Sequence, residues 1–314
     1  MKVVYSDRYA IDIGLHVFPT EKYRLVRARL VESGAVSSSN IIEPTPATWE
    51  ELALVHTVDY LDRLRLGTLT PADVAQLELP WSNEMVGAFR VMVGGTILAA
   101  RLATNPESQI PNPVVCHIGG GLHHAFPNHG EGFCPFNDVA VAVRVLQARG
   151  LERQAIVDLD VHHGNGTAFI FESDPRVWTF SMHQQHNYPM WKPPGSLDIG
   201  LADGTHDATY LRELERALPS VVAHRPRCAF YLAGADPYED DQLGGLRLTK
   251  AGLRARDRMV IDTLRAAGIP LVVLLAGGYA RRVQDTVEIH AATIEEAGRA
   301  GTAGLRSASA RTPS

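Results

Sequence analysis

The second half of the chain alternates short, continuous apolar runs with longer segments whose apolar residues recur at helical spacing. Such uninterrupted runs are typical of strands that are buried on both faces of a parallel sheet. They predict strands at 113–118, 154–160, 177–183, 227–234 and 270–278. The intervening segments predict helices at 137–150, 166–173, 207–225, 249–268 and 281–299.

The first hundred residues predict one short strand at 2–5, followed mainly by helices at 20–34, 55–67 and 82–103. Strands alternating with helices indicate one doubly wound α/β domain with helices on both faces of the sheet. We expect this single domain to span residues 1–300. Residues 301–314 are small and polar, which predicts a flexible tail.

Composition narrows the class of protein. Hydrophobic residues make up 45% of the chain, enough for a large core, and the formal net charge is -5 without a basic stripe. This disfavours direct binding to nucleic acid. The three cysteines, Cys116, Cys134 and Cys228, form no CxxC pair, and their odd number suits reduced thiols. We therefore expect a cytoplasmic protein.

Two segments bear on membranes and export. Asp7 and Asp12 interrupt the first residues, so these do not form the apolar core of a signal peptide. The apolar stretch 85–103 contains Arg90 and Arg101, which predicts a buried helix rather than a membrane span.

Polar residues gather just after the predicted strands, where parallel α/β sheets bind their ligands. Asp158, Asp160 and His162 stand at alternate positions, so in an extended chain they share one face. Asp236 ends another strand. Each aspartate alone is more typical of a capping or turn residue at a strand–helix junction. Together with His162, three nitrogen and oxygen donors with a position left for water are typical of a catalytic zinc site.

Further candidates follow two other strands. His123 and His124 follow three glycines, Gly119 to Gly121, and Leu122. A neutral imidazole is a general base suited to neutral pH, although a histidine pair is also common in surface loops. Tyr279 follows two glycines at the last strand, and its hydroxyl is suited to stabilising an oxyanion.

Six ordered sequence blocks resemble the histone deacetylase and acetoin-utilisation protein family: GGGLHHA, GFCPFND, DLDVHHGNGT, TFSMH, AGADPYEDDQLGG and LAGGY. The segments HVFPTEKY, HNYP and QLGGLRLT are similar to its class IV branch and bacterial relatives. The resemblance covers roughly residues 10 to 295. It implies an arginase-like α/β fold with a mostly parallel eight-stranded sheet.

The resemblance also implies roles for individual residues. Asp160, His162 and Asp236 would bind Zn²⁺, with Fe²⁺ as an alternative because ligands do not fix the metal. His124 would be the general base and proton shuttle, His123 its electrostatic partner, and Asp158 the residue that orients His123. Tyr279 would polarise the scissile carbonyl.

For the substrate, the resemblance implies that Gly132 accepts a hydrogen bond from its amide and that Phe133 lines the acyl-lysine tunnel. A structural K⁺ would lie beside Asp158 and Ser181, with backbone carbonyls of Asp160, His162 and Met182.

Two departures from the family's class I pattern stand out. The residue expected to face His124 is Asn165 rather than an aspartate. The class I enzymes also carry an arginine beneath the site, and here Lys22, Tyr23 and Arg24 are the candidates for that place.

The function implied is zinc-dependent hydrolysis of linear amides, which removes acetyl or longer acyl groups from lysine side chains. The first alternative is a deacetylase of small acylated amines such as acetylpolyamines, with the acidic run Glu239, Asp240 and Asp241 selecting a cationic tail. The second is a non-catalytic acyl-lysine reader. The expected partners are an acylated peptide or amine, and the sequence sets no expectation for the oligomeric state.

Overall fold

The computed structural model describes residues 1–108 and 113–309, and it is built around one sheet of eight parallel strands. Their order is β2-β1-β3-β8-β7-β4-β5-β6, and every neighbouring pair is parallel. The strands are β1 (Lys2–Val4), β2 (Ile41–Ile42), β3 (Val114–His117), β4 (Gln154–Asp158), β5 (Val177–Gln184), β6 (Leu197–Leu201), β7 (Cys228–Leu232) and β8 (Leu271–Leu274).

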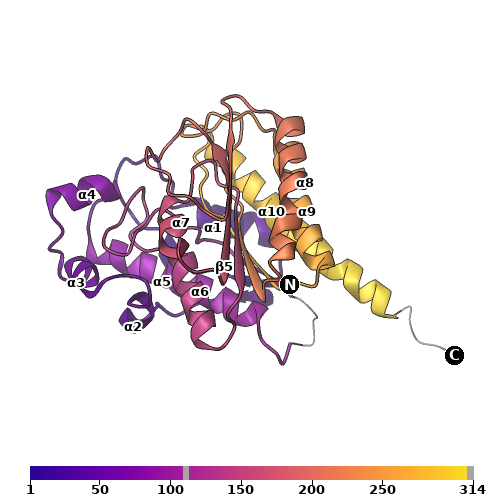
Figure 1. Cartoon of the computed structure of the whole chain (residues 1–314), viewed down its shortest axis with the longest axis horizontal. Coiled ribbons are helices and arrows are strands. Elements are labelled where there is room, and N and C mark those ends of the chain that lie inside the picture. Colours follow the sequence, from indigo (N-terminus) through magenta and orange to yellow (C-terminus); the bar gives the residue numbers. More distant parts are fainter. Residues whose placement is uncertain (109–112, 310–314) are drawn as a thin grey trace.

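Helices cover both faces of this sheet (Figure 1). One face carries α5 (Asn83–Ala103), α6 (Asp138–Ala148) and α7 (Asn165–Phe171). The other carries α8 (Asp207–Ala223), α9 (Lys250–Ala266) and α10 (Val283–Ser309), and α1 (Lys22–Glu32) packs on α10. The short helices α2 (Trp49–Leu52), α3 (Val58–Leu66) and α4 (Pro71–Leu77) extend to one side (Figure 1). The predicted doubly wound architecture is confirmed.

The four central strands β3, β8, β7 and β4 are buried at every position, which is why their sequences are continuous apolar runs. The edge strands β2 and β6 lack that pattern: β2 has two half-buried residues, and β6 alternates between half-buried and exposed positions until its last residue. Sequence periodicity therefore missed both, because an edge strand presents much of its surface to water.

Helix α5 is long and apolar enough to cross a membrane, but 72% of its most apolar window is buried inside the protein. It packs against α6 and β3. The expected core helix is therefore what the chain forms.

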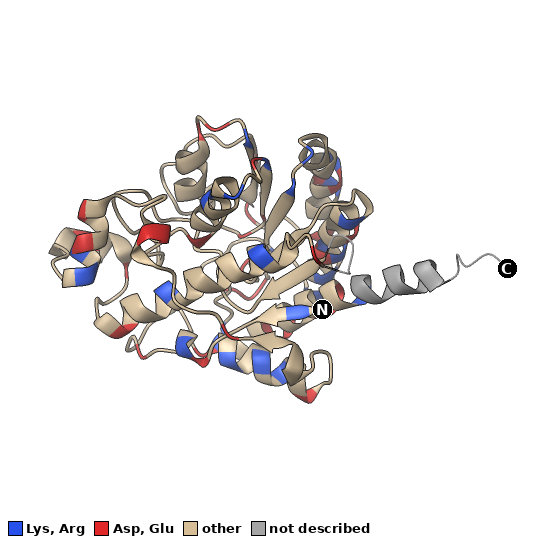
Figure 2. Cartoon of the chain, turned by 90° about the horizontal axis from the view of Figure 1, so that it is seen from below, with Lys and Arg blue, Asp and Glu red and all other residues tan. Residues whose placement is uncertain are grey.

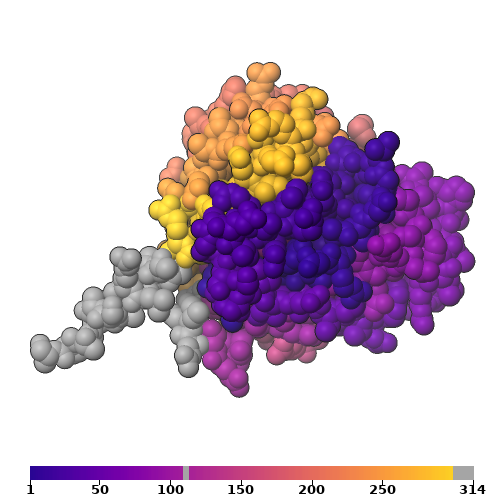
Figure 3. All heavy atoms as spheres, turned by 180° about the vertical axis from the view of Figure 1, so that it is seen from behind, coloured from indigo at the N-terminus to yellow at the C-terminus, as the bar shows by residue number. Residues whose placement is uncertain are grey.

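Segments from the two ends of the chain pack together on the face seen in Figure 3, where the N-terminal residues lie beside α10. The predicted domain end at residue 300 falls within α10. Residues 310–314 lie outside the described part of the chain, so the tail stays a prediction. Basic and acidic residues are interspersed along the helices in Figure 2, consistent with the absence of a basic stripe in the sequence.

The strand order determines where a site can form. Strands β3, β8, β7 and β4 are consecutive neighbours, and their last residues are paired: His117 with Leu274, and Leu232 with both Leu274 and Asp158. The loops that follow these four strands therefore leave the sheet side by side, at its carboxyl edge.

Candidate active site

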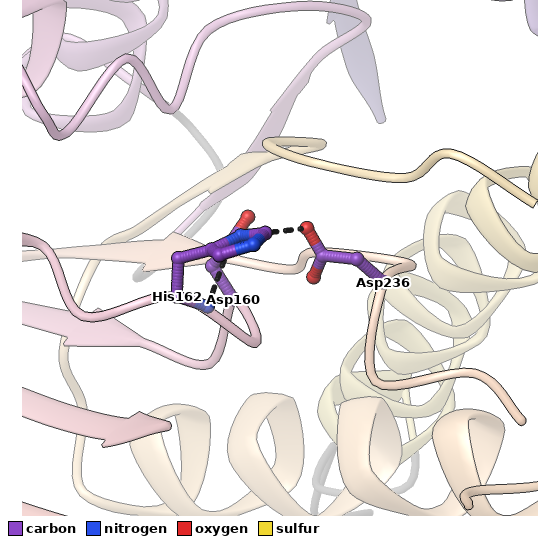
Figure 4. Close-up of side chains that lie close together, drawn as sticks. All are labelled: Asp160, His162 and Asp236. Atoms are coloured by element: carbon purple, nitrogen blue, oxygen red, sulfur yellow. Dashed lines mark hydrogen bonds and ion pairs between the residues drawn. The ribbon is translucent and has the colours of Figure 1, made fainter. Parts of the chain in front are cut away.

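Asp160, His162 and Asp236 converge at this edge, and all three are buried (Figure 4). One potential ligand atom from each lies within 4.8 Å of the others. The Nδ1 atom of His162 faces both carboxylates, 3.0 Å from Asp160 Oδ1 and 3.6 Å from Asp236 Oδ2. In residues 1–108 and 113–309, this is the one group of three such donors close enough to hold a metal.

The local chain explains how Asp160 and His162 reach the site. Strand β4 ends at Asp158, so the two residues do not share a strand face as the alternation predicted. Instead, Asp158 Oδ1 accepts from the backbone N–H of Asp160, and Asp160 Oδ1 accepts from that of His162. Carboxylates that bond to the N–H two residues on are turn-forming, and the two successive turns curl the chain over the sheet edge.

The carboxylates are held from the neighbouring loops. The N–H of Gly277 donates to Asp160 Oδ2 over 2.8 Å, and the N–H of Val161 donates to Asp236 Oδ1 over 2.9 Å. Asp236 Oδ2 is buried and has no hydrogen-bond partner among the described residues. Burial and the charge of Asp160 raise the pKa of Asp236. The site thus concentrates negative charge that a cation would neutralise.

The tandem histidines lie beside this cluster. His123 Nδ1 is 2.6 Å from Asp158 Oδ2, and the two histidine Nε2 atoms are 3.0 Å apart. His124 Nδ1 is 2.7 Å from Asn165 Oδ1. Burial lowers the pKa of His123, but Asp158 and Asp160 outweigh it and raise that pKa to about 9. Burial, with His123 and His162, lowers the pKa of His124 well below its usual value, so His124 is the neutral partner.

The glycines before the histidines allow a tight loop. Gly120 and Gly121 adopt φ of 72° and 83°, a region that favours glycine. The N–H groups of Gly121 and Leu122 both donate to the buried carboxylate of Asp138 at the start of α6. This anchor places the histidine pair against the loops that carry the candidate metal ligands.

A pocket of about 170 Å³ leads from the surface to these residues. It is lined by Glu78, His124, Gly132, Phe133, His162, Asn187, Tyr188, Leu243 and Tyr279. A smaller inner cavity shares five of those residues and continues to His123 and Asp160. One continuous path therefore connects solvent, the histidine pair and the candidate metal-binding cluster.

Tyr279 lies on the wall of both spaces and is 9% exposed. Its N–H donates to Asp241 Oδ2 over 2.7 Å, which anchors the loop after β8. Burial and the nearby Asp160 raise the pKa of its phenol well above the usual value. The hydroxyl therefore stays protonated and can act as a hydrogen-bond donor.

Gly132 and Phe133 form the opposite wall. Both have positive φ, 51° and 65°, and their N–H groups donate to the carbonyls of Gln76 and Leu77 at the end of α4. The Phe133 ring stacks on Phe18 at 6.0 Å and meets Tyr279 edge-on at 5.9 Å. The wall is thus aromatic and fixed by backbone hydrogen bonds.

The residues expected around K⁺ lie on two paired strands and in the loop that follows the first of them. Asp158 and Ser181 are direct register partners in β4 and β5, and Met182 follows Ser181. Ser181 Oγ is 3.0 Å from His183 Nδ1. Asp158, Asp160, His162, Ser181 and Met182 are all buried.

Of the three candidates for the place of the class I arginine, Lys22 is the buried cation. It has no exposed surface, and its Nζ donates to the carbonyl of Ala276 over 3.0 Å. Nζ also lies 5.3 Å from the centre of the Tyr279 ring. Arg24 is exposed, and Tyr23 is a buried aromatic side chain lining the inner cavity.

The acidic run does not face the pocket. Asp241 is buried and accepts from the N–H groups of Leu243, Gly244 and Tyr279, while Asp240 forms an ion pair with Arg281. Glu239 and Asp240 do not line the pocket. Its rim carboxylate is instead Glu78, at the end of α4 with φ of 58°.

Sequence reasoning did not single out Glu78, Tyr188, Leu243 or Glu131. Tyr188 falls within the HNYP segment, which carried only a family signal. Leu243 falls within QLGGLRLT, which likewise carried only a family signal. Glu78 and Glu131 belong to no chemical pattern in the sequence. The fold alone brings Glu78 to the pocket wall and Glu131 to Asn165 and Tyr188.

Comparison with known proteins agrees with this geometry. The family model of the histone deacetylase domain, which describes the sequence of that family, matches residues 16–294 of this chain. An uncharacterised protein of Picosynechococcus sp. is 43% identical over 291 residues, covering 92% of this chain and 95% of that protein. Histone deacetylase 2 of Arabidopsis thaliana is 34% identical, covering 92% of this chain and 78% of its own.

Among solved structures, an HDAC homolog complexed with SAHA superposes with a TM-score of 0.78 at 23% identity. The match covers 95% of this chain and 84% of the other, which shows a shared, arginase-like fold. From the domain match and the relatives together, this chain belongs to the histone deacetylase family of hydrolases.

Proposed function

We propose that this protein is a zinc-dependent amidohydrolase that removes acetyl or longer acyl groups from lysine side chains. The proposal is based on three groups that lie around one pocket: the Asp160–His162–Asp236 cluster, the tandem histidines and Tyr279. Membership of a hydrolase family supports the same reaction class.

The residues present fit a divalent metal. One imidazole nitrogen and two carboxylates are a donor set that Zn²⁺ accepts, and Fe²⁺ suits it as well. The buried Oδ2 of Asp236 supports this: His162 Nδ1 lies 3.6 Å away, but no described residue donates a hydrogen bond to this oxygen, and a buried carboxylate oxygen without a hydrogen bond is costly. When bound there by Asp160, His162 and Asp236, the metal supplies Lewis acidity toward the acyl carbonyl and lowers the pKa of water.

The protein's own groups complete the reaction. Neutral His124 takes the proton of the attacking water and later gives one to the leaving amine. His123, held by Asp158 with a raised pKa, contributes positive charge near the developing oxyanion. The Tyr279 hydroxyl donates a hydrogen bond to that oxyanion, a contribution of about 2.7–4 kcal/mol in comparable sites.

The pocket supports a linear acylated amine as the substrate. Phe133 and Tyr188 line its walls, and Gly132 has a carbonyl suited to accept from the substrate amide. The HDAC homolog crystallised with SAHA supports an extended ligand in such a pocket. The acetylpolyamine alternative loses the support of Asp240 and Asp241, which are engaged elsewhere, so acyl-lysine remains first.

Two further parts belong to the proposal. A structural K⁺ would lie between β4 and β5, supported by the register pairing of Asp158 with Ser181 and by the burial of both. Cytoplasmic residence is supported by three buried free cysteines, Cys116, Cys134 and Cys228.

The testing experiment measures both metal and turnover. Freshly purified protein is analysed for metals, stripped, reloaded with Zn²⁺ or Fe²⁺, and assayed on acetyl-, octanoyl- and myristoyl-lysine peptides and acetylated polyamines. We expect one catalytic divalent metal per chain and turnover of an acyl-lysine peptide that stripping abolishes.

Asp236→Ala should abolish metal binding. Asp262→Ala, which removes an exposed aspartate on α9, is the matched control. Metal binding by the Asp236 variant equal to that of the control would argue against the assigned site. Peptide binding without turnover in metal-loaded protein would favour the acyl-lysine reader instead.

A further inference from the structure

Glu131 is the centre of a hydrogen-bond network beside His124. Its Oε1 accepts from Asn165 Nδ2 over 2.6 Å and from the Tyr188 hydroxyl over 3.0 Å. Its Oε2 accepts from Gln76 Nε2 over 3.1 Å and lies 3.4 Å from His129 Nε2. Four donors surround one carboxylate, which is only 14% exposed. A network this complete defines the position of each member.

The carboxylate decides which way the Asn165 amide points. An ionised carboxylate accepts hydrogen bonds and cannot donate them, so the NH₂ end of Asn165 must face Glu131. The oxygen end then faces His124 Nδ1, at 2.7 Å. Asn165 is 1% exposed, so bulk solvent does not reach either end of its amide.

The amide orientation in turn decides the tautomer of His124. An amide oxygen is an acceptor, so His124 must carry its proton on Nδ1. Its lone pair then resides on Nε2, the atom 3.0 Å from His123 Nε2. A flipped Asn165 would present NH₂ to Nδ1 and force the proton onto Nε2, which leaves no base on that side of the ring.

We propose that Glu131 is a positioning residue that holds His124, through the Asn165 amide, in the tautomer with its lone pair on Nε2. The catalytic meaning rests on the proposed function, in which His124 is the base. An aspartate at position 165 would not need such a partner, since both of its oxygens are acceptors. In this chain the base His124 contacts the neutral Asn165, and Asn165 in turn contacts the carboxylate of Glu131.

The surroundings keep Glu131 ionised and in place. Burial alone would raise its pKa, but the hydrogen bonds from His129, Asn165, Gln76 and Tyr188 outweigh it and lower the pKa. Glu131 also exchanges backbone hydrogen bonds with Cys134, and the following N–H groups are bonded to α4. The acceptor thus stands on a rigid loop.

The test is a double-mutant cycle between Glu131→Gln and Asn165→Asp in metal-loaded protein. A glutamine at 131 has one acceptor and one donor end, so it no longer selects a single orientation of Asn165. We expect kcat to fall by at least about tenfold, since a catalytic histidine in the wrong tautomer can lose ~10⁴-fold.

In the Asn165→Asp background the same Glu131→Gln change should cause no loss, because a side-chain amide then donates to an aspartate. An equal loss in both backgrounds would overturn the proposal and indicate a purely structural role. Glu32→Gln, an exposed glutamate on α1, controls for the lost charge.

A second measurement does not depend on turnover. In ¹⁵N NMR of the zinc-loaded protein with labelled histidine, His124 should carry its proton on Nδ1 in the parent and lose that preference in Glu131→Gln. An unchanged tautomer in the folded variant would refute the inference while leaving the hydrolase proposal intact. A parent without turnover on any acyl substrate, but with the expected tautomer change, would refute only the hydrolase.

Discussion

Arg256 Nη1 donates a hydrogen bond to the backbone carbonyl of Gly234, 2.7 Å away, from a side chain with no exposed surface. The same nitrogen reaches the carbonyl of Leu159 over 3.3 Å. These carbonyls lie shortly before Asp236 and directly before Asp160. The Nε of Arg256 bonds Asp257 over 2.9 Å, so its charge is balanced in the core. One buried cation therefore joins the two loops that carry the carboxylates of the proposed metal site.

Arg256→Met should weaken both the fold and metal binding. It leaves Asp257 buried without its cation, which typically costs about 3–5 kcal/mol. It also frees both ligand loops. Urea unfolding and a chelator competition measure the two effects. Arg212→Met, which removes an arginine that is 50% exposed, is the control and should cost at most about 1 kcal/mol. Similar losses in the two variants would contradict the assigned role.

Tyr279→Phe should reduce kcat by on the order of 10²-fold or more, as removal of an oxyanion donor does. Peptide binding should change far less, because the interaction is stronger in the transition state than in the ground state. Steady-state kinetics and binding titration separate the two. Tyr238→Phe removes a hydroxyl outside the pocket and should leave kcat unchanged. Full kcat in the Tyr279 variant would show that this hydroxyl plays no part.

Lys22→Met should change how stability depends on pH. Burial lowers the pKa of Lys22 from 10.5 to about 8 in the folded protein. Between those values the unfolded chain binds more protons, so the parent gains stability as pH rises from 8 to 10.5, by about 3 kcal/mol in total. The methionine variant lacks this gain.

The measurement for Lys22 is the difference in unfolding free energy between parent and variant, followed from about pH 7 to about pH 11 so that both pKa values are spanned. Groups common to both proteins cancel in that difference. Lys2→Met, which removes an exposed lysine, is compared in the same way. A difference for Lys22→Met that stays constant with pH would mean that folding leaves the pKa of Lys22 unchanged, which would contradict the expected lowering.

A hydroxamate mimic of acyl-lysine should inhibit competitively, because it combines a metal-chelating head with a chain that suits the aromatic pocket. His123, His124 and Tyr279 line the space where the head would lie. Inhibition constants are measured against an acyl-lysine peptide, with the corresponding carboxamide as the control that chelates poorly. No inhibition of metal-loaded protein by any hydroxamate of suitable width would argue against this binding mode.

Local sequence predicted the central strands and the residues next to them, because burial on both faces of a sheet leaves a continuous apolar run in the chain itself. It also predicted that Asp160 and His162 lie together, but on one face of an extended chain, whereas the structure brings them together through two short turns after β4. The edge strands β2 and β6, partly exposed to water, lacked that pattern and were missed.

Only the tertiary structure decided which distant groups complete the site. The placement of β8 between β3 and β7 brings the Tyr279 loop against the histidine pair and Asp236. Lys22 reaches Ala276 across 254 positions of sequence, and Glu131 reaches Asn165 across 34. Periodicity along a chain reports how deeply a residue is buried, but its partners depend on strand order and on how loops pack above the sheet. The local sequence therefore indicates which groups can act as donors, and the tertiary fold brings these groups together.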